Sequence, residues 1–409
     1  MKISSIIAEY NPLHNGHLYH INKTKEETNS DAIICIMSGN YVQRGIPAII
    51  DKWNRAKAAL ECGVDLVLEL PVLYSVSSAE FFAYGSVSLL NSLGVVDSIC
   101  FGSELGDIEC ILSVAEVLND EPEEFKKLLK DALNTGLPYP SARNIALSKY
   151  LPHNSHSSNE LLNQILGASN NILAVEYCKS LLKLGSNIKP FTIKRQGGTY
   201  NSSELNNIFS SATSIRKYLK NNIGLKELQN HIPHSTFDLL CKIKNENYDF
   251  VFPDSMINFL RYKYFTTSSD ITKLPDVSEG LHNKIYKSLI NAVSYDDLIE
   301  NIKSKRYTYT RISRILCQYF IGFEEYDTRF LRTQSCPYAR ILGFNEKGTE
   351  ILKKIKAHTS IPVLTKVPRE LPDVFKLDIR ATNSYSLLSS TIKPNSDYLT
   401  SPIKVGALY

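Results

Sequence analysis

The segment Ile3-Ser4-Ser5-Ile6-Ile7-Ala8 and the residues that follow it, Glu9-Tyr10-Asn11-Pro12-Leu13-His14-Asn15-Gly16-His17, decide the fold class of this 409-residue chain. The apolar run predicts a short buried strand, and the periodic residues from Gly16 to Glu27 predict a helix that begins directly after it. Amide groups at a helix start are free to donate, and the helix dipole favours negative charge there. This strand, turn and helix therefore predict an anion-binding site at the end of the first strand.

The alternation of strand and helix signals continues to about residue 194. Further apolar runs predict strands, and glycines directly after periodic segments predict where the helices end. The expected strands are Ile3–Ala8, Ala32–Met37, Val64–Leu70, Val95–Phe101 and Ile188–Lys194, and the expected helices are Gly16–Glu27, Lys52–Cys62, Ser78–Ser92 and Asn171–Leu184. Near-continuous apolar strands separated by helices predict a Rossmann-like α/β fold, with a parallel sheet covered on both faces.

Two parts of the chain depart from this alternation. Residues 107–166 show no strand signal and predict a helical insertion rich in Glu and Lys. After about residue 220 we expect mainly helices, followed by a small α/β unit at about 338–367. The expected organisation is a catalytic core at residues 1–220 and a mostly helical C-terminal region at residues 221–409.

Composition excludes several classes of protein. Hydrophobic residues make up 43% and charged residues 22%, which is ordinary globular usage and argues against disorder and fibrous structure. No run approaches the roughly 18 apolar residues of a membrane span, and the N-terminus lacks a signal-peptide pattern. The eight cysteines are scattered, so neither a disulfide scaffold nor a zinc ribbon is expected. We expect a cytoplasmic protein with reduced cysteines. The net charge of +4 permits an anionic partner without requiring one.

The spacing of the two histidines in the first turn does not identify them as functional, and their position in the chain is needed as well. HxxH occurs three times, as His14/His17, His153/His156 and His231/His234. Only the first pair follows the first strand with a glycine between its members, so only there do we expect donors to phosphate oxygens and to a leaving pyrophosphate. Zinc is an alternative for this pair, although the HExxH ligand pattern is missing. The phosphate fingerprints GxGxxG and GxxxxGK[ST] are also missing, which argues against a dinucleotide dehydrogenase and a P-loop NTPase.

The segment His14-Asn15-Gly16-His17 resembles the HxGH signature of the nucleotidyltransferases that cleave ATP between the α and β phosphates. A second segment, Ser211-Ala212-Thr213-Ser214-Ile215-Arg216, resembles the phosphate loop of the same superfamily. Hydroxyls and amides at a helix start, with an arginine one turn later, suit the β and γ phosphates. Without the first motif, an ordinary helix N-cap would be the preferred interpretation of Ser211–Ser214.

Further blocks, in this order, resemble the tRNA(Met) cytidine acetate ligase family over the whole chain. They are Ser38–Gly45, Asp51–Arg55, Asp65–Pro71, Phe101–Glu104, Asn170–Tyr177 and Lys194-Arg195. The resemblance implies a bacterial cytoplasmic enzyme that activates acetate with ATP to acetyl-adenylate. It also implies transfer of the acetyl group to N4 of the wobble cytidine of elongator methionine tRNA. ATP is then the co-substrate, with Mg²⁺ on its phosphates, and neither DNA nor a membrane is an expected partner.

The resemblance also implies which residues form the site. The expected ATP contacts are Ile7, Ala8, Glu9, Tyr10, Asn11, Pro12, Leu13, His14, Asn15, Gly16, His17, Leu18, Tyr19, His20, Gly102, Asn170, Arg195, Ser211, Thr213, Ser214 and Arg216. Gly102 would leave room for adenine or ribose. Asn170 could cap its helix, the commoner use, or read the adenine edge, and whether Asn170 or Asn171 contacts the nucleotide stays open. The expected catalytic residues are His14, His17, Lys52 and Arg44, where Arg44 or Lys52 would neutralise acetate and the adenylate. A solvated surface loop is the alternative for the polar block around them.

The stretch Ile302–Arg314 predicts contact with RNA. Residues 301–340 hold eight Lys or Arg against three acids, with tyrosines between the positive residues. Basic groups contact phosphates and aromatic faces stack on unpaired bases, so the expected tRNA contacts are Lys305, Arg306, Tyr307, Tyr309, Arg311 and Arg314. A solvated helix face over core tyrosines is the alternative. Two other functions stay open: a small-molecule adenylyltransferase of the same superfamily, and a nucleotide-sensing RNA-binding protein without catalysis.

Overall fold

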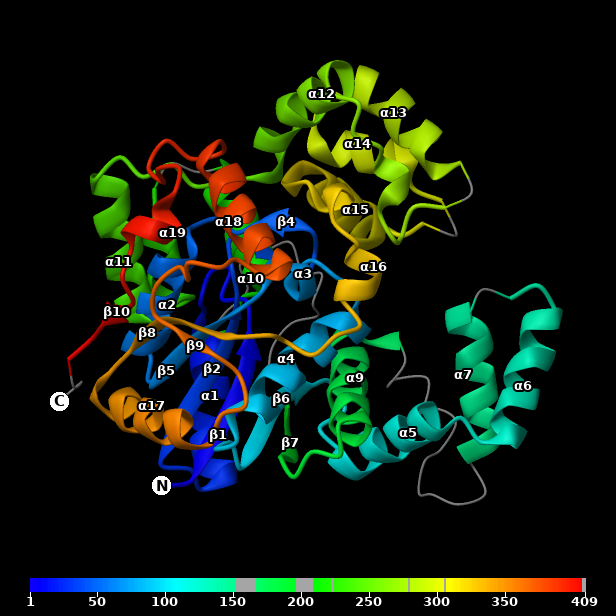
Figure 1. The fold of residues 1–409 in the computed structure, drawn as a ribbon, viewed down its shortest axis with the longest axis horizontal. Coiled ribbons are helices and arrows are strands. Elements are labelled where there is room, and N and C mark those ends of the chain that lie inside the picture. Colours follow the sequence, from blue (N-terminus) through cyan, green and yellow to red (C-terminus); the bar gives the residue numbers. More distant parts are fainter. Residues whose placement is uncertain are drawn as a thin grey trace.

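The computed structural model describes residues 1–137, 139–151, 167–195, 209–221, 224–278, 280–304 and 307–406 (Figure 1). At its centre lies a sheet in the order β10-β8-β5-β2-β1-β6-β7, with β9 beside β8. The five expected strands are all present and pair in parallel. They are β1 (Ile3–Ala8), β2 (Ala32–Ser38), β5 (Leu66–Leu70), β6 (Ser98–Ser103) and β7 (Lys189–Lys194). The predicted Rossmann-like core is confirmed.

The central strand β2 shows why this sheet is covered on both faces. Every residue of β2 is buried, because alternate side chains of a strand enter opposite layers. Ile33 and Cys35 join a core with α1 and α2, whereas Ile34 and Ile36 join a second core with α4. The helices of the two layers begin and end close to their expected bounds: α1 (Asn15–Thr28), α2 (Lys52–Glu61), α4 (Ala79–Leu93) and α9 (Ser169–Lys183).

The C-terminal region completes the same sheet. The expected strand, helix and strand are present as β8 (Ala339–Phe344), α17 (Glu346–His358) and β9 (Val363–Leu364). They do not form a separate unit, because β8 pairs antiparallel with β5 and parallel with β10 (Ile403–Lys404). One hydrophobic cluster runs from Ile3 to Tyr385, so residue 220 does not divide the core.

Two groups of helices surround this core, as Figure 1 shows. The described part of the insertion, up to residue 151, forms α5 (Ile108–Asp120), α6 (Glu123–Asn134) and α7 (Tyr139–Tyr150), and is helical as expected. The second half contributes α10 (Ala212–Asn221), α11 (His234–Asn245), α12 (Ile257–Thr266), α13 (Leu281–Asn291), α14 (Tyr295–Ile302), α15 (Tyr309–Ile321), α16 (Thr328–Leu331), α18 (Asp373–Ser386) and α19 (Ser396–Leu399). Within the described ranges, no helix has both the length and the apolar character to cross a membrane.

Two short elements were not expected from the sequence. The chain after β2 forms a small hairpin of β3 (Tyr41–Val42) and β4 (Ile46–Pro47), and the helix α3 (Val72–Ser75) follows β5. Strands of two residues carry no detectable alternation. The hairpin matters for function because it holds Gln43 and Arg44 beside the end of β1.

Candidate active site

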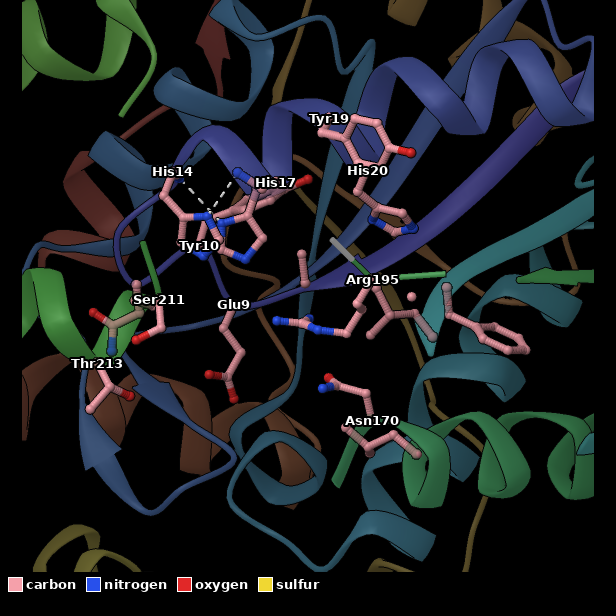
Figure 2. Close-up of a pocket in the computed structure, with 18 of the residues that line it drawn as sticks. Glu9, Tyr10, His14, His17, Tyr19, His20, Asn170, Arg195, Ser211 and Thr213 are labelled. Atoms are coloured by element: carbon pink, nitrogen blue, oxygen red, sulfur yellow. Dashed lines mark hydrogen bonds between the residues drawn. The ribbon is translucent and has the colours of Figure 1, made fainter. Parts of the chain in front are cut away.

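A cavity of about 230 Å³ lies at the carboxyl ends of β1, β6 and β7. In an open parallel sheet this is the edge at which nucleotides bind. The first turn of α1, the start of α9, the segment before α10 and the hairpin close its sides. In Figure 2, His14 and His17 lie at one end, Asn170 and Arg195 at the other, and Glu9 between them.

The two histidines of the first turn are fixed by the helix they begin. His14 is the N-cap of α1, and its Nδ1 accepts a hydrogen bond from the Gly16 amide at 3.1 Å. The Nδ1 of His17 accepts from the His14 amide at 3.3 Å, which completes a reciprocal capping box. The two rings stack with their centroids 3.7 Å apart. Because both Nδ1 atoms accept hydrogen bonds, a neutral ring carries its proton on Nε2 and offers a donor there.

Burial keeps these rings neutral. It lowers the pKa of His14 to about 3, with further lowering by the nearby Arg195 and Arg216. Burial also lowers the pKa of His17 well below its usual value, and that of His20 to about 4. At neutral pH the first turn therefore presents two uncharged Nε2–H donors. Gly16 allows this arrangement, since a Cβ there would stand 3.0 Å from the His14 ring.

The start of α10 and the residue before it form the wall next to the histidines. Ser211, Thr213 and Arg216 line the cavity. Arg216 donates to the Asn11 carbonyl at 2.7 Å and to the Thr213 hydroxyl at 3.2 Å, which ties this segment to the first turn. Ser214 does not line the cavity, because its hydroxyl donates to the Ser211 carbonyl at 2.8 Å. The predicted phosphate loop and the predicted first turn therefore meet at one place.

At the opposite end of the cavity, the structure shows which of the two neighbouring asparagines, Asn170 or Asn171, faces the cavity. Asn170 lines the cavity and donates to Glu104 Oε1 at 2.6 Å. Asn171 is buried, and its Oδ1 accepts from the amides of Glu104 and Leu105 at 2.8 and 3.2 Å. Asn170 is thus the residue that faces the cavity, whereas Asn171 holds the turn after β6.

Gly102 and Arg195 also lie at this end. Both line the cavity. A Cβ at Gly102 would stand 3.3 Å from the Arg195 Cγ. The close neighbour that favours glycine is therefore the stem of Arg195, in addition to any space left for a ligand.

The hairpin forms the third wall. Gln43 and Arg44 line the cavity, and the Gln43 amide donates to Glu9 Oε1 at 2.8 Å. Arg55 lies behind this wall, fully buried, and donates to the carbonyls of Glu9 and Ser38 at 2.7 and 3.0 Å. The polar block is therefore an internal framework, and its interpretation as a solvated loop is wrong.

The structure contradicts the expected place of Lys52. Its side chain is 0% exposed, and its Nζ lies 2.8 Å from both Glu69 Oε1 and Asp397 Oδ1. Arg340 joins the same carboxylates at 3.3 and 2.8 Å. Lys52 does not line the cavity, because the first residue of α2 is directed into this buried ion cluster. Arg44 is the expected acetate-side cation that does line it.

The expected ATP contacts fall into two groups, those that line the cavity and those that do not. Those that line the cavity are Ile7, Ala8, Glu9, Tyr10, Asn11, His14, Gly16, His17, Tyr19, His20, Gly102, Asn170, Arg195, Ser211, Thr213 and Arg216. Those that do not are Pro12, Leu13, Asn15, Leu18 and Ser214. Sequence reasoning missed Gln43, Phe82, Phe101, Leu173, Tyr177, Ile193, Lys194, Phe209, Ser210 and Ala212 as lining residues. Phe82, Ile193 and Phe209 look like ordinary core positions outside the quoted segments. Gln43, Phe101, Leu173, Tyr177, Lys194 and Ala212 stood within those segments but were not singled out as contacts.

The other HxxH pairs have different surroundings. His153 and His156 lie outside the described residues. His231 borders the site, since its Nδ1 lies 2.9 Å from the hydroxyl of Ser210, a lining residue. His234 is exposed and pairs with Asp238 at 2.8 Å. Among the described residues no group of three or more His, Cys, Asp or Glu gathers as a metal site, and the first pair has both Nδ1 atoms engaged by backbone amides.

The expected RNA-contacting stretch is only partly available to a ligand. Lys305 and Arg306 lie outside the described residues. Tyr307 is 8% exposed, donates to the Ser278 carbonyl at 2.9 Å and is covered by Arg311, so the expectation that it stacks on a base is wrong. Tyr309 is half-buried and donates to Asp296 at 2.7 Å. Arg311 and Arg314 are partly exposed.

Comparisons with known proteins agree with this architecture. The family model described as HIGH Nucleotidyl Transferase matches residues 1–398. The tRNA(Met) cytidine acetate ligases of Clostridium novyi and Clostridium tetani are 56% and 50% identical over 403 residues, covering 98% of this chain and 99% and 100% of theirs. Crystal structures of Thermotoga maritima TmcAL, apo and bound with alpha-thio ATP, superpose with TM-scores of 0.91 and 0.90 at 36% identity, over the full length of both chains. The chain therefore belongs to the HIGH nucleotidyl transferase family and, within it, to the tRNA(Met) cytidine acetate ligases.

Proposed function

We propose that this protein activates acetate with ATP and transfers the acetyl group to N4 of the wobble cytidine of elongator methionine tRNA. The observation that carries the proposal is the first turn of α1, where two neutral histidines present Nε2–H donors beside the Ser211–Arg216 segment. The curated relatives are named for this ligation. The proposal places the protein in the cytoplasm, where ATP and tRNA are available.

The first step forms acetyl-adenylate. A carboxylate oxygen of acetate attacks the α-phosphorus of ATP, the bond from that phosphorus to the oxygen bridging to the β phosphate breaks, and pyrophosphate leaves with the electron pair. Negative charge grows on the leaving group, so donors fixed before the reaction stabilise it most. His14 and His17 supply neutral donors, while Thr213 and Arg216 offer a hydroxyl and a cation from the adjoining wall.

The other end of the cavity suits the nucleoside. Phe101 and Ile193 give apolar surface for a base, and Asn170 offers amide groups to its edge. A solved relative of 36% identity is bound with alpha-thio ATP, which supports this use of the cavity. We infer that ATP lies with its base between β6 and α9 and its phosphates at the start of α1.

Magnesium is compatible with the residues present. Mg²⁺ is usually held by one or two carboxylates together with substrate phosphates. Glu9 is the carboxylate among the described lining residues, and it lies between the two ends of the cavity (Figure 2). Glu9 would hold the ion on the phosphates. A bound ion would neutralise charge on the β and γ oxygens.

Acetate and the second step involve the hairpin. Because Lys52 lies in the buried ion cluster and does not line the cavity, whereas Arg44 does, Arg44 is the cation that we assign to the acetate carboxylate. In the second step the N4 amine of cytidine attacks the acetyl carbonyl carbon, the bond between that carbon and the phosphate oxygen breaks, and AMP leaves with the electron pair. The nitrogen then releases one proton to solvent.

Exchange of labelled pyrophosphate into ATP tests the first step. Exchange that requires acetate shows that an adenylate of acetate forms reversibly. Mass spectrometry of methionine tRNA after incubation with protein, ATP and acetate tests the second step, and the expected result is one added acetyl group on the wobble cytidine. Exchange that proceeds equally without acetate would contradict the proposal.

A further inference from the structure

Three arginines gather around Asp276, next to the hairpin. Arg311 and Arg314 lie on α15, and Arg332 directly follows α16. Arg332 Nη1 lies 3.5 Å from Asp276 Oδ1, and Arg311 Nη2 donates to the Asp276 carbonyl at 2.8 Å. Burial lowers the pKa of Arg314, Asp276 opposes this, and Arg311 and Arg332 lower the pKa further, so all four groups interact. We call Arg311, Arg314 and Arg332 the arginine cluster.

The arginine cluster has more donors than acceptors. Arg332 is the member that lies beside the carboxylate of Asp276, whereas Arg311 donates to its backbone carbonyl, so this single carboxylate does not balance the three positive charges. The Nε atoms of Arg314 and Arg332 are buried, and no acceptor for either lies among the described residues. A buried donor without an acceptor is costly. All three side chains are partly exposed, and the planar fork of arginine matches an anion with several oxygens such as phosphate.

Aromatic rings hold two of these guanidinium groups in place. Arg332 Cζ lies 4.1 Å from the centre of the Phe81 ring, and Arg311 Cζ lies 4.7 Å from that of Tyr307. Such stacking fixes the plane of an arginine without using its N–H groups. Tyr307, which does not stack on a base, thus supports Arg311 instead. The arginine cluster is organised before any ligand arrives.

The position of the arginine cluster connects it with the active site. Gly45 has a φ of 77°, and a Cβ there would collide with the backbone of Arg314. Ser313 Oγ donates to the Gly45 carbonyl at 2.9 Å, so α15 packs directly on the hairpin, as its place beside β4 in Figure 1 indicates. The residue before Gly45 is Arg44, and the residue after Phe81 is Phe82. Both of these line the cavity.

We propose that Arg311, Arg314 and Arg332 bind a phosphodiester of the RNA strand that presents its cytidine to the cavity. This inference rests on the proposed function, and it identifies Arg332 as a contact that the sequence stretch Ile302–Arg314 does not include. The chemistry is that of a phosphate group. Arg314 lies against Gly45 and Arg332 against Phe81, and each of these two contacted residues is next in sequence to a lining residue. This position favours a phosphate near the target base.

The test compares Arg332→Ala with Arg329→Ala. Arg329 lies three residues earlier on α16 and is exposed, so both variants lose one positive charge from the same short segment. The affinity of methionine tRNA is measured from low to high salt. We expect Arg332→Ala to weaken binding on the order of tenfold and to flatten the slope of log affinity against log salt by about 0.7. Arg329→Ala should keep the parent values.

A second pair of variants keeps the test valid if Arg332→Ala is destabilised. If Arg332→Ala melts well below the parent, Arg332→Lys is compared with Arg329→Lys. Lysine keeps the charge but loses the two-pronged contact, so Arg332→Lys should bind tRNA more weakly while retaining most of the salt slope. Equal tRNA binding by the two lysine variants overturns the proposal.

Two further measurements distinguish an RNA phosphate from a free anion and from a direct effect on adenylate formation. Inorganic phosphate is titrated against the melting temperature without RNA. If it stabilises the parent while Arg332→Ala binds tRNA normally, the arginine cluster takes a free anion and the proposal is wrong. Pyrophosphate exchange is followed separately. A parent without acetate-dependent exchange contradicts the proposed reaction but leaves the tRNA comparison valid, whereas loss of exchange with unchanged tRNA affinity in Arg332→Ala overturns the proposal.

Discussion

The two sides of the cavity are built over very different distances along the chain. On the α1 side, His14 and His17 are held by amides within three residues of each other. On the hairpin side, Lys52 is held by Glu69 and by Asp397 near the end of the chain, and the Gly45 turn packs against α15. A short motif therefore describes how the two histidines are held, whereas the second side depends on the completed tertiary structure.

The buried ion cluster gives the largest expected effect on the hairpin side. Lys52→Ala leaves Glu69 and Asp397 with Arg340 alone, and removal of one partner from a buried pair typically costs about 3–5 kcal/mol. Urea unfolding should show a loss of that order. Lys57→Ala is the matched control, because Lys57 lies on the same helix and its ion pair with Glu61 is 3.7 Å long and partly exposed.

The same variant separates stability from catalysis. If Lys52 were a catalytic residue, Lys52→Ala would abolish pyrophosphate exchange at unchanged unfolding free energy. We expect the opposite result. The unfolding free energy of Lys52→Ala should be lowered, and the protein that remains folded at low temperature should retain pyrophosphate exchange.

His17→Ala tests the locally built side. It removes one neutral donor from the place where we locate the leaving pyrophosphate, and the loss of one such donor typically lowers the rate by about 10²–10³. Acetate-dependent exchange measures this effect. His234→Ala is the control, since His234 is exposed and pairs only with Asp238 among the described residues. Near-normal exchange in His17→Ala would show that the ring is only part of the capping box.

The contrast also explains what could be predicted from the sequence. Strands β1, β2, β5, β6 and β7, the helix stops and the first turn follow from periodicity and capping, which are local. The meeting of the Ser211–Arg216 segment with the HNGH turn was implied by family resemblance, and the Arg216 bond to Asn11 now gives its geometry. The antiparallel β8 was expected as a strand, but its pairing with β5 depends on a return of the chain that no local pattern encodes.

Other features could not have been predicted from the sequence, and the reasons are physical. Lys52 and Arg44 are equally polar in sequence, and only the distant carboxylates of Glu69 and Asp397 distinguish them. Phe82 and Tyr177 lie on helices at positions that look like ordinary core. Tyrosines between basic residues suggested base stacking, yet Tyr307 is covered by Arg311.

Ser313→Ala tests whether the contact between α15 and the hairpin matters for acetate binding. It removes the 2.9 Å hydrogen bond to the Gly45 carbonyl, while Tyr295 remains 3.4 Å from the same oxygen. The loss of one such bond is worth about 1 kcal/mol. Because Gly45 follows Arg44, we expect the KM for acetate to rise about fivefold with the KM for ATP unchanged. Ser113→Ala on the insertion, which removes a hydroxyl bonded to the Glu109 carbonyl, is the control. Equal rises in both Michaelis constants would contradict a specific role in placing Arg44.

The smallest effect concerns pH and returns to the histidine side. Burial lowers the pKa of His14 to about 3 and that of His20 to about 4 from 6.5. The unfolded chain therefore binds more protons than the folded one between these values, and the unfolding free energy falls as pH drops from about 6.5 towards 4. One fully shielded histidine contributes about 1 kcal/mol of this loss by pH 5.5, and partial exposure of His20 to the cavity reduces its share.

Above pH 6.5 this contribution to stability is fully present, and both rings of the first turn stay neutral. Exchange should therefore vary little between pH 6.5 and 8 on account of His14 and His17, in contrast to a site that relies on a protonated histidine. His14→Asn isolates the effect, because asparagine retains an N-cap acceptor but does not titrate. Urea unfolding at pH 7.5 and 5.5 should show a smaller decrease for His14→Asn than for the parent. Equal decreases would mean that His14 is protonated in the folded protein at pH 5.5, and the uncharged-donor description of the α1 side would then fail.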